Sequence, residues 1–259
     1  MSASKTEEEL KIEDHGGHTV KVIPRNCRSG KKRRFQDGSS DLLAATIAFA
    51  DDVRCPFQIF PALLKHPKAF GSLDKKNPPK LKMPHRVDFE YMRTLPSKDL
   101  LMKWAFNLTK ANMTQFYNAC PGWSWSDRRK KAELRHGKAR FLVAIAAEQS
   151  AMVGGHIRHP IGFIHMRYEI ERDKPVLYIY EFQVEPDYQG LGLGQSMLTW
   201  VEALARHLNL RSLMLTVFKA NVAAFRFYQK AGFTLDQDSP GLVDVEGSHG
   251  YEILSKAVV

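Results

Sequence analysis

The chain has 259 residues, of which 44% are hydrophobic and 10% aromatic, so it can form one large domain or two small ones around a sizeable core. Its formal net charge of +10 indicates an acidic partner or a compartment rich in nucleic acid. The three cysteines are widely spaced and odd in number, which argues against a disulfide framework or a zinc site and indicates a reducing interior. We expect no secretory signal and no membrane span, because the N-terminus lacks an apolar stretch and the longest apolar run, 42–50, is too short.

The first 85 residues show little hydrophobic periodicity. Residues 1–40 are polar and charged and are expected to form a disordered basic tail. Within it, the basic run 31–34 fits a nuclear import signal, a nucleic-acid contact or a plain solvated tail. Residues 41–85 are expected to form a short helix capped by Asp41, over 41–50, followed by a Pro- and Lys-rich segment that wraps around or links to the domain. The folded domain is predicted to span 86–259.

The pattern after residue 86 predicts alternating helices and strands. A strand is expected over 87–91, and Ser97 is placed to cap a helix whose apolar residues recur at helical spacing through Leu108. A second helical piece is expected over 112–119, followed by a turn over 121–125. The stretch 127–138 reads as a charged helix or loop, and its basic run is more typical of a solvated face than of a binding site.

The second half of the chain predicts a mixed sheet. The elements expected there are strands over 141–147, 161–170 and 176–184, with turns at 154–155 and 172–175, a helix over 193–208, a strand over 212–218, a helix from Asn221 to Gly232 and a last strand over 250–255. The first three strands form an antiparallel meander. The next helix is a crossover connection, which demands a parallel pair. We therefore predict an α+β fold with a central sheet, mostly antiparallel, with one parallel crossover and helices on both faces.

A glycine-rich turn joins the strand 176–184 to the helix that follows. Backbone N–H groups at a helix N-terminus, together with the helix dipole, favour phosphate. A dinucleotide fingerprint needs Gly-x-Gly-x-x-Gly early in a parallel unit, whereas the spacing here is Gly190-x-Gly192-x-Gly194 after an antiparallel meander. A Walker loop needs Gly-Lys-Ser/Thr, and the lysine is absent from this turn. The turn thus indicates a phosphate site of another kind.

The stretch Gln189-Gly-Leu-Gly-Leu-Gly194 resembles the Gln/Arg-x-x-Gly-x-Gly/Ala signature of the GNAT acetyltransferases, and Asn221 with 224–233 looks like their second cofactor element. Blocks at 104–113, 123–127, 176–181, 213–219 and 251–255 are similar to the NatD-type histone N-terminal acetyltransferases. The resemblance implies the GNAT fold, acetyl-CoA as co-substrate and no metal. It also implies acetylation of the N-terminal serine of histones of types two-A and four, which begin Ser-Gly-Arg-Gly.

The expected partners follow from this resemblance. Histone tails are the expected substrates, and the basic tail at 1–40 is expected to contact nucleosomes or ribosomes. We further expect a monomer that is located in the nucleus and the cytoplasm and makes no membrane contact. Two other hypotheses stay open: a GNAT enzyme acting on lysine or a small amine, and a non-catalytic basic module that binds nucleic acid.

The resemblance also implies a cofactor site along the strand end and the turn. Its expected residues are Phe182, Gln183, Val184, Gln189, Gly190, Leu191, Gly192, Leu193, Gly194, Gln195 and Asn221. Backbone N–H groups of 182–184 would hold the acetyl carbonyl and the pantetheine arm, and the glycine turn would hold the pyrophosphate.

Acetyl transfer needs a neutral amine, and an N-terminal amine with a pKa of about 7.7–8 needs only a modest base. Glu181, in mid-strand among apolar neighbours, is the predicted base, directly or through a water, and the alternative is a carboxylate paired with a nearby Arg or Lys. Strict alternation puts Tyr178 and Tyr180 on the face opposite Glu181, so the three share a site only if the strand bulges. Tyr228 matches the tyrosine that protonates the leaving thiolate in many GNAT enzymes, with core packing as the alternative.

Substrate contacts are implied in the same way. The expected residues are Tyr117, Trp123, Glu169, Ile170, Glu171, Tyr178, Tyr180, Thr216, Ser239 and Tyr251. Glu169 and Glu171 are expected to receive the substrate arginine, the alternative being solvated acids at a strand end. For Trp123 and Tyr251 the alternative is core packing. Three histidines at 156, 159 and 165 do not predict a metal site, because no carboxylate or cysteine partner has the required spacing.

Overall fold

The computed structural model describes residues 86–95, 100–150, 155–243 and 249–258. The predictions for 1–85, for the cap at Ser97 and for the start of the turn at Gly154 lie outside these ranges. The described elements are, in chain order, β1 (Arg86–Met92), α4 (Leu100–Ala119), α5 (Asp127–Leu134), β2 (Arg140–Ser150), β3 (Gly155–Glu171), β4 (Lys174–Val184), the 3-10 turn η2 (Pro186–Tyr188), α6 (Leu193–His207), β5 (Ser212–Phe218), α7 (Val222–Lys230), β6 (Thr234–Leu235), α8 (Pro240–Val243) and β7 (Tyr251–Ala257).

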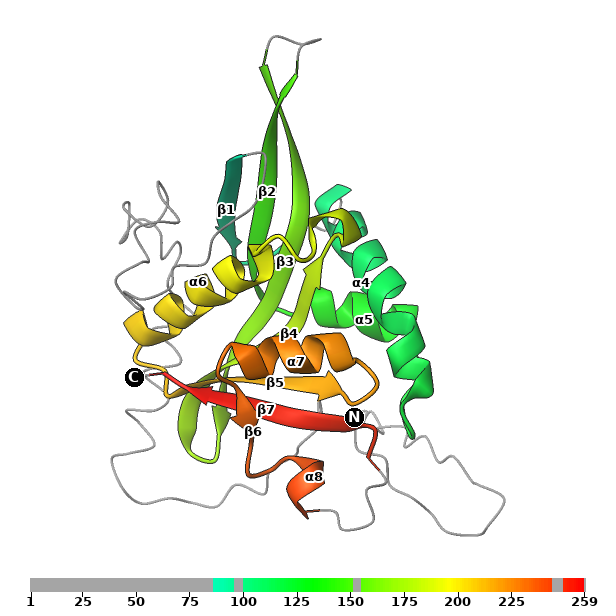
Figure 1. Cartoon of the computed structure of the whole chain (residues 1–259), viewed down its shortest axis with the longest axis vertical. Helices are drawn as coiled ribbons and strands as arrows, with labels where there is room; N and C mark the ends of the chain where they lie inside the picture. The colour runs from blue at the N-terminus through cyan, green and yellow to red at the C-terminus, as the bar shows by residue number, and fades with distance from the viewer. Residues whose placement is uncertain (1–85, 96–99, 151–154, 244–248, 259) are drawn as a thin grey trace, which may run out of the picture. The chain divides into compact units, whose positions relative to one another are not determined.

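The strands form a single sheet in the order β1-β2-β3-β4-β5-β7-β6 (Figure 1). β1 to β4 pair as an antiparallel meander, and β7 pairs antiparallel with both β5 and β6. β4 and β5 are parallel because α6 carries the chain across between them. The predicted mixed sheet, mostly antiparallel with one parallel pair, is therefore confirmed.

The parallel pair is short. β4 and β5 pair only from Val176 opposite Ser212 to Ile179 opposite Leu215, although β4 continues to Val184. Residues 180–184 therefore have no ladder partner on their β5 side. The two strands separate at this point, next to the start of α6.

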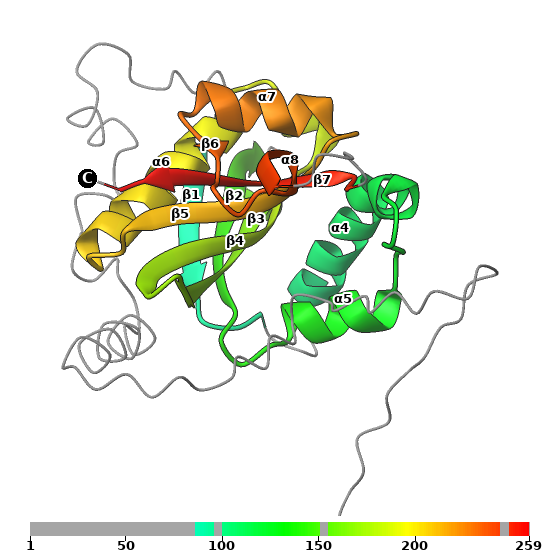
Figure 2. The ribbon, with the colours of Figure 1, turned by 90° about the horizontal axis from the view of Figure 1, so that it is seen from below.

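Helices cover both faces of the sheet (Figure 2). On one face, Leu177 and Ile179 belong to a buried cluster with Met197 and Val201 of α6. On the other face, residues of β2 and β3 such as Phe163 pack against the buried side of α4. Each fully buried apolar side chain contributes roughly 1.5–3 kcal/mol, so the two layers hold α4, α5, α6 and α7 firmly against the strands.

The structure differs from the predicted elements in three places. α4 is one helix of 20 residues rather than two pieces, because its polar middle also packs against the domain: Thr109 is buried, and Asn112 donates to Gln183 of β4. β3 begins at Gly155 rather than at 161, because its first residues pair with the end of β2. β6 and α8 were not predicted, since two and four residues are too few to give a periodic pattern.

Within the described ranges, no helix combines the length and the apolar character needed to cross a membrane.

Candidate active site

A β-bulge in β4 brings Tyr178, Tyr180 and Glu181 to one face of the sheet. In the β3–β4 ladder, His165 lies opposite Glu181, while the next β3 residue lies opposite Ile179, which leaves Tyr180 as an extra residue. A single extra residue shifts the alternation of side chains by one position. Tyr178, Tyr180 and Glu181 could share a site only if β4 contained a bulge, and this bulge is present where β4 separates from β5.

The contacts on either side of the bulge confirm this change of face. Before it, Tyr178 lies on the face away from α6, with its hydroxyl 2.6 Å from the hydroxyl of Thr216. After it, Glu181 and Gln183 are directed at α4 and α5, whereas Phe182 packs against the core beside α6 and α7. Without the bulge, Glu181 would take the place of an apolar core residue.

Glu181 is buried and has a partner at each carboxylate oxygen. Its side chain is 3% exposed and forms an ion pair with Lys130 of α5 through Oε1. Its Oε2 accepts a hydrogen bond of 2.8 Å from the side-chain amide of Gln183. The pairing with a lysine, which the sequence left as an alternative, is thus present in the structure.

Lys130 is the centre of this polar cluster. Besides Glu181, its Nζ donates to the Tyr117 hydroxyl at 2.9 Å and to Oε1 of Glu133 at 2.7 Å. Burial alone would lower the pKa of Lys130, but the charges of Glu181 and Glu133 outweigh it and hold that pKa well above its ordinary value. Burial raises the pKa of Glu133, and the negative charge of Glu181 adds to the rise.

The prediction that the basic run in 127–138 lies on a solvated face was wrong for Lys130, which is buried. Its neighbours Arg128 and Arg129 are exposed, but Lys130 itself is 4% exposed. The available signal was its spacing of four from Leu134, which places both residues on the buried side of α5. A lysine in a basic run gives no further hint that it is buried.

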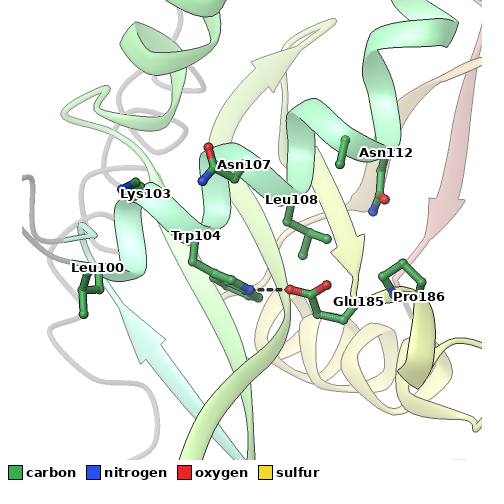
Figure 3. A pocket seen from close by; sticks show the side chains of 9 residues that line it. Leu100, Lys103, Trp104, Asn107, Leu108, Asn112, Glu185 and Pro186 are labelled. Carbon is green, nitrogen blue, oxygen red and sulfur yellow. Dashed lines mark hydrogen bonds between the residues drawn. The ribbon is translucent and has the colours of Figure 1, made fainter.

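The cluster continues from β4 to α4. Gln183 accepts a hydrogen bond of 3.0 Å from the side-chain amide of Asn112. Nearer the start of α4, the indole of Trp104 donates to Glu185 at 2.6 Å, as Figure 3 shows. An open pocket of about 580 Å³ lies here between α4 and the residues that follow β4, with Pro186 on its wall. Both contacts fix the carboxyl end of β4 relative to α4.

Tyr180 points along the sheet toward the end of β3. Its hydroxyl donates to Glu169 at 3.3 Å, and the guanidinium of Arg167 lies 4.0 Å from the centre of its ring. Burial raises the pKa of Tyr180 well above its ordinary value, and the Glu169 carboxylate raises it further. Glu169 is half-buried and Ile170 is exposed, so the predicted substrate-contacting end of β3 is accessible.

Four aromatic rings from separate elements meet beside this cluster. Tyr117 lies 5.7 Å from Trp123 and 4.9 Å from Phe218, and Trp123 lies 5.5 Å from Tyr251, between ring centres. Trp123 as a whole is still 37% exposed. The group therefore joins the loop after α4 to the ends of β5 and β7 and presents a partly exposed aromatic surface.

Ser239, another predicted substrate residue, lies against β7. It is fully buried, its hydroxyl donates to Glu252, and it accepts a hydrogen bond of 2.8 Å from the backbone of Ile253. These contacts tie the loop before β7 to β7 itself. The geometry gives Ser239 a structural role.

The glycine turn has the backbone that its sequence predicts. Gly190 and Gly192 have φ angles of 72° and 88°, a left-handed conformation that side chains rarely adopt. Gly192 caps α6, whose first turn contains no acidic residue, so its N–H groups and the helix dipole favour an anion. A Cβ at Gly194 would lie 3.3 Å from the ring of Phe227, so this glycine allows α6 and α7 to approach each other.

The other predicted cofactor residues divide by exposure. Leu193 is buried in the core, so only its backbone is available to a ligand. Gln189 is exposed and its side chain donates to the Val184 carbonyl at 3.0 Å, while Leu191 and Gln195 are partly buried. Asn221 caps α7, as predicted, by accepting a hydrogen bond of 3.2 Å from the Ala224 amide.

Tyr228 lies in α7 across from the end of β4. Its ring packs against Phe182, Phe227 and Phe233 and is 8% exposed, so the core-packing alternative describes the ring. Among the described residues its hydroxyl has no hydrogen-bond partner. Burial, with the charge of Glu181, raises the pKa of Tyr228 well above its ordinary value, which keeps its proton in place near neutral pH.

The described part of the chain contains no group of three or more metal-ligating side chains. His165 is fully buried between the rings of Phe141 and Tyr180, and burial holds its pKa well below the ordinary value. His159 forms a hydrogen bond of 2.9 Å with the Tyr188 hydroxyl.

Comparison with known proteins gives one family match. Residues 110–233 match the model of the Acetyltransferase (GNAT) family. This range contains α5, β2 to β5, the glycine turn, α6 and α7.

Two curated relatives are both named mycothiol acetyltransferase. The protein of Geodermatophilus obscurus is 28% identical over 159 residues, which cover 60% of this chain and 47% of that protein. The protein of Thermobispora bispora is 33% identical over 113 residues, which cover 43% of this chain and 36% of that protein. The chain thus spans less than half of the length of these relatives.

Solved structures also align with this chain. Arabidopsis thaliana NAA60, in complex with a bisubstrate analogue, is 14% identical, with 66% of this chain and 99% of that chain covered and a TM-score of 0.47. The PaiA N-acetyltransferase of Thermoplasma acidophilum, in complex with coenzyme A, is 19% identical. The alignment covers 66% of this chain and 99% of that chain, with a TM-score of 0.44.

Proposed function

This chain is a protein of the GNAT superfamily, and from that premise we propose that it transfers the acetyl group of acetyl-CoA to an N-terminal α-amine. The observation that carries the proposal is the bulge in β4. It places a carboxylate, Glu181, and two tyrosines on one face, at the point where β4 and β5 separate and beside the glycine turn. An amine and an acyl donor can meet there.

The residues at the turn fit the phosphates of acetyl-CoA. Glycines at 190 and 192 take the left-handed backbone that leads into α6, and the N-terminus of α6 offers free N–H groups and the favourable end of its dipole. The unpaired edge of 182–184 would hold the pantetheine arm and the acetyl carbonyl. When bound, acetyl-CoA supplies an acetyl group activated as a thioester.

Glu181 accepts the proton that the substrate amine must lose before it attacks. Its carboxylate is held in place by the ion pair with Lys130, and an α-amine with a pKa of about 7.7–8 gives up its proton to a modest base. Tyr228 supports the other half of the reaction. Its hydroxyl is protonated near neutral pH and can stabilise the leaving thiolate by donating a hydrogen bond to it.

The proposed substrate is the Ser-Gly-Arg-Gly start of histones of types two-A and four. Glu169, with Glu171 two residues on, lies beside Tyr180, where a substrate arginine would gain charge-assisted hydrogen bonds. The net charge of +10 does not prevent this, because long-range repulsion is screened within about 8 Å at physiological salt. Histone tails as partners, and a nuclear and cytoplasmic location, belong to the same proposal.

A small-molecule amine is the competing substrate. It is favoured by the two relatives that are named mycothiol acetyltransferase. Lysine side chains are the third choice, and they need a stronger base because their ordinary pKa is about 10.4.

The test compares four acceptors with acetyl-CoA: a Ser-Gly-Arg-Gly peptide, the same peptide with a blocked N-terminus and an added lysine, a Ser-Gly-Glu-Gly peptide, and an amino sugar. Mass spectrometry locates the acetyl group. We expect transfer to the free serine amine, a large loss with the glutamate peptide, and a smaller arginine preference in Glu169→Gln. Acetylation of the blocked peptide or the amino sugar, while the free N-terminus stays unmodified, would overturn the proposal.

A further inference from the structure

We infer that Lys130 and Glu133 of α5 are positioning residues for the proton-accepting step at Glu181. Lys130 holds the Glu181 carboxylate in place, and Glu133 provides Lys130 with a second counter-charge, so that Glu181 can take up a proton without leaving the buried lysine unpaired. The inference rests on the proposed function, in which Glu181 accepts a proton from the substrate amine.

The geometry of the lysine supports this assignment. An ammonium has three N–H donors, and Nζ of Lys130 has three acceptors: Glu181, Glu133 at 2.7 Å and the Tyr117 hydroxyl at 2.9 Å. The spacing of three between Lys130 and Glu133 places both side chains on one side of α5. With every donor used, the ammonium cannot turn away, and it fixes the orientation of the Glu181 carboxylate.

The cluster around Lys130 contains more carboxylates than ammonium groups. One ammonium faces two carboxylates, whose side chains are 3% exposed at Glu181 and 17% at Glu133. Arg167 of β3 is the other cation nearby, but its guanidinium donates to the backbone carbonyl of Glu133 at 2.9 Å rather than to a carboxylate. The two carboxylates therefore share Lys130.

The remaining groups that face the cluster are neutral. Tyr117 comes from α4 and stays protonated, because burial and the charge of Glu181 raise its pKa. Gln183 comes from β4, and His165 from β3 is held neutral by burial. Tyr228 of α7, whose pKa burial and the Glu181 charge also raise, stays protonated as well. The charged side chains near Glu181 are thus Lys130, Glu133 and Arg167.

Sharing the lysine has a direct chemical consequence. A carboxylate paired alone with a buried ammonium is a weak base, because the cation favours its charged form. A second carboxylate on the same ammonium opposes that effect. When the N–H bond of the substrate ammonium breaks and the proton forms an O–H bond on Glu181, Lys130 and Glu133 remain as a complete ion pair. No uncompensated charge is left in the interior.

The test is the pH dependence of kcat/KM for α-amine acetylation by three variants. Glu133→Gln removes the second counter-charge but keeps an oxygen acceptor for Lys130, so we expect the acid limb to move about 1 unit to lower pH, with about a tenfold loss at neutral pH. Lys130→Met removes the cation, so we expect the acid limb to move about 1 unit to higher pH. Lys131→Met is the matched control, because that lysine lies over the Phe106 ring away from Glu181, and its profile should match the wild type.

Shifts of opposite sign distinguish this role from a structural one, which would lower activity without moving either profile in a predictable direction. The titration of the substrate amine is common to all variants and does not affect the comparison. Acid limbs that stay in place, or that move the same way in both variants, would overturn the inference. Should Lys130→Met fail to fold, the Glu133→Gln profile decides alone. A wild-type protein that acetylates no α-amine would overturn the proposed function and the inference with it.

Discussion

Replacing Glu181 by glutamine tests the proposed base with little change of shape. The glutamine keeps an oxygen for Lys130, which retains its contacts with Glu133 and Tyr117. Exchanging an ion pair for a neutral hydrogen bond should therefore cost about 1 kcal/mol of stability. Loss of a positioned general base costs about 10²–10⁴ in rate, which is about 3–5 kcal/mol of transition-state stabilisation. The expected loss in kcat is thus far larger than the loss in stability.

Glu181→Ala separates packing from chemistry. It leaves Lys130 with two acceptors instead of three and removes the acceptor of the Gln183 amide. An unsatisfied buried group costs about 1–3 kcal/mol, so the midpoint of thermal unfolding should fall by about 2–12 °C. The alanine variant should lose activity to the same extent as the glutamine variant, because both lack the base.

The assay is single-turnover acetylation of the Ser-Gly-Arg-Gly peptide, with CoA binding measured by calorimetry and unfolding by scanning calorimetry. Glu202→Gln is the control, because it removes a carboxylate paired with Lys256 at a distance from the bulge. CoA affinity should be within about twofold of wild type in all variants. Wild-type turnover by Glu181→Gln would show that Glu181 is not the base and would refute the reasoning from the buried cluster.

Three further outcomes are expected. Ser239→Ala removes a buried hydrogen-bond donor to Glu252, so it should lower the free energy of unfolding by about 1–3 kcal/mol and leave the KM for peptide unchanged. A raised KM with normal stability would instead place Ser239 in the substrate site. Burial alone would raise the pKa of Glu252, but the hydrogen bond from Ser239 and other contacts lower that pKa below its ordinary value. The ionised Glu252 carboxylate therefore stabilises the folded protein above pH ~4.3, and this stabilisation is lost as the pH falls through the lowered pKa. Acid unfolding of the wild type and of Ser239→Ala would measure the difference. Gly194→Ala places a methyl group against the ring of Phe227 and should weaken CoA binding about tenfold. Gly137→Ala is the control, because a methyl group there has no neighbouring atom within 4 Å, and it should leave CoA binding unchanged. Equal CoA affinities in the two variants would show that the close packing of α6 against α7 does not shape the cofactor site.

Strong local signals account for what the sequence predicted well. The glycines of the turn are readable because positive φ angles favour glycine, and Asn221 is readable because its side chain caps the next helix. The crossover helix required one parallel pair, and the structure contains it between β4 and β5. Predictions failed where the signal was short or masked by polar residues, as in the middle of α4 and in β6.

The sequence by itself determined the order of the elements, the mixed sheet and the glycine turn, because each of these depends on residues that are neighbours along the chain. Only the tertiary structure decided what surrounds Glu181. The bulge at Tyr180 depends on the register of β3 against β4, and the partners Lys130 and Glu133 come from a helix about 50 residues earlier. Beyond its spacing of four from Leu134, no local pattern distinguishes this buried lysine from the exposed residues of the same basic run. That lysine is held in the interior by two carboxylates that meet only once α5 has packed against the sheet.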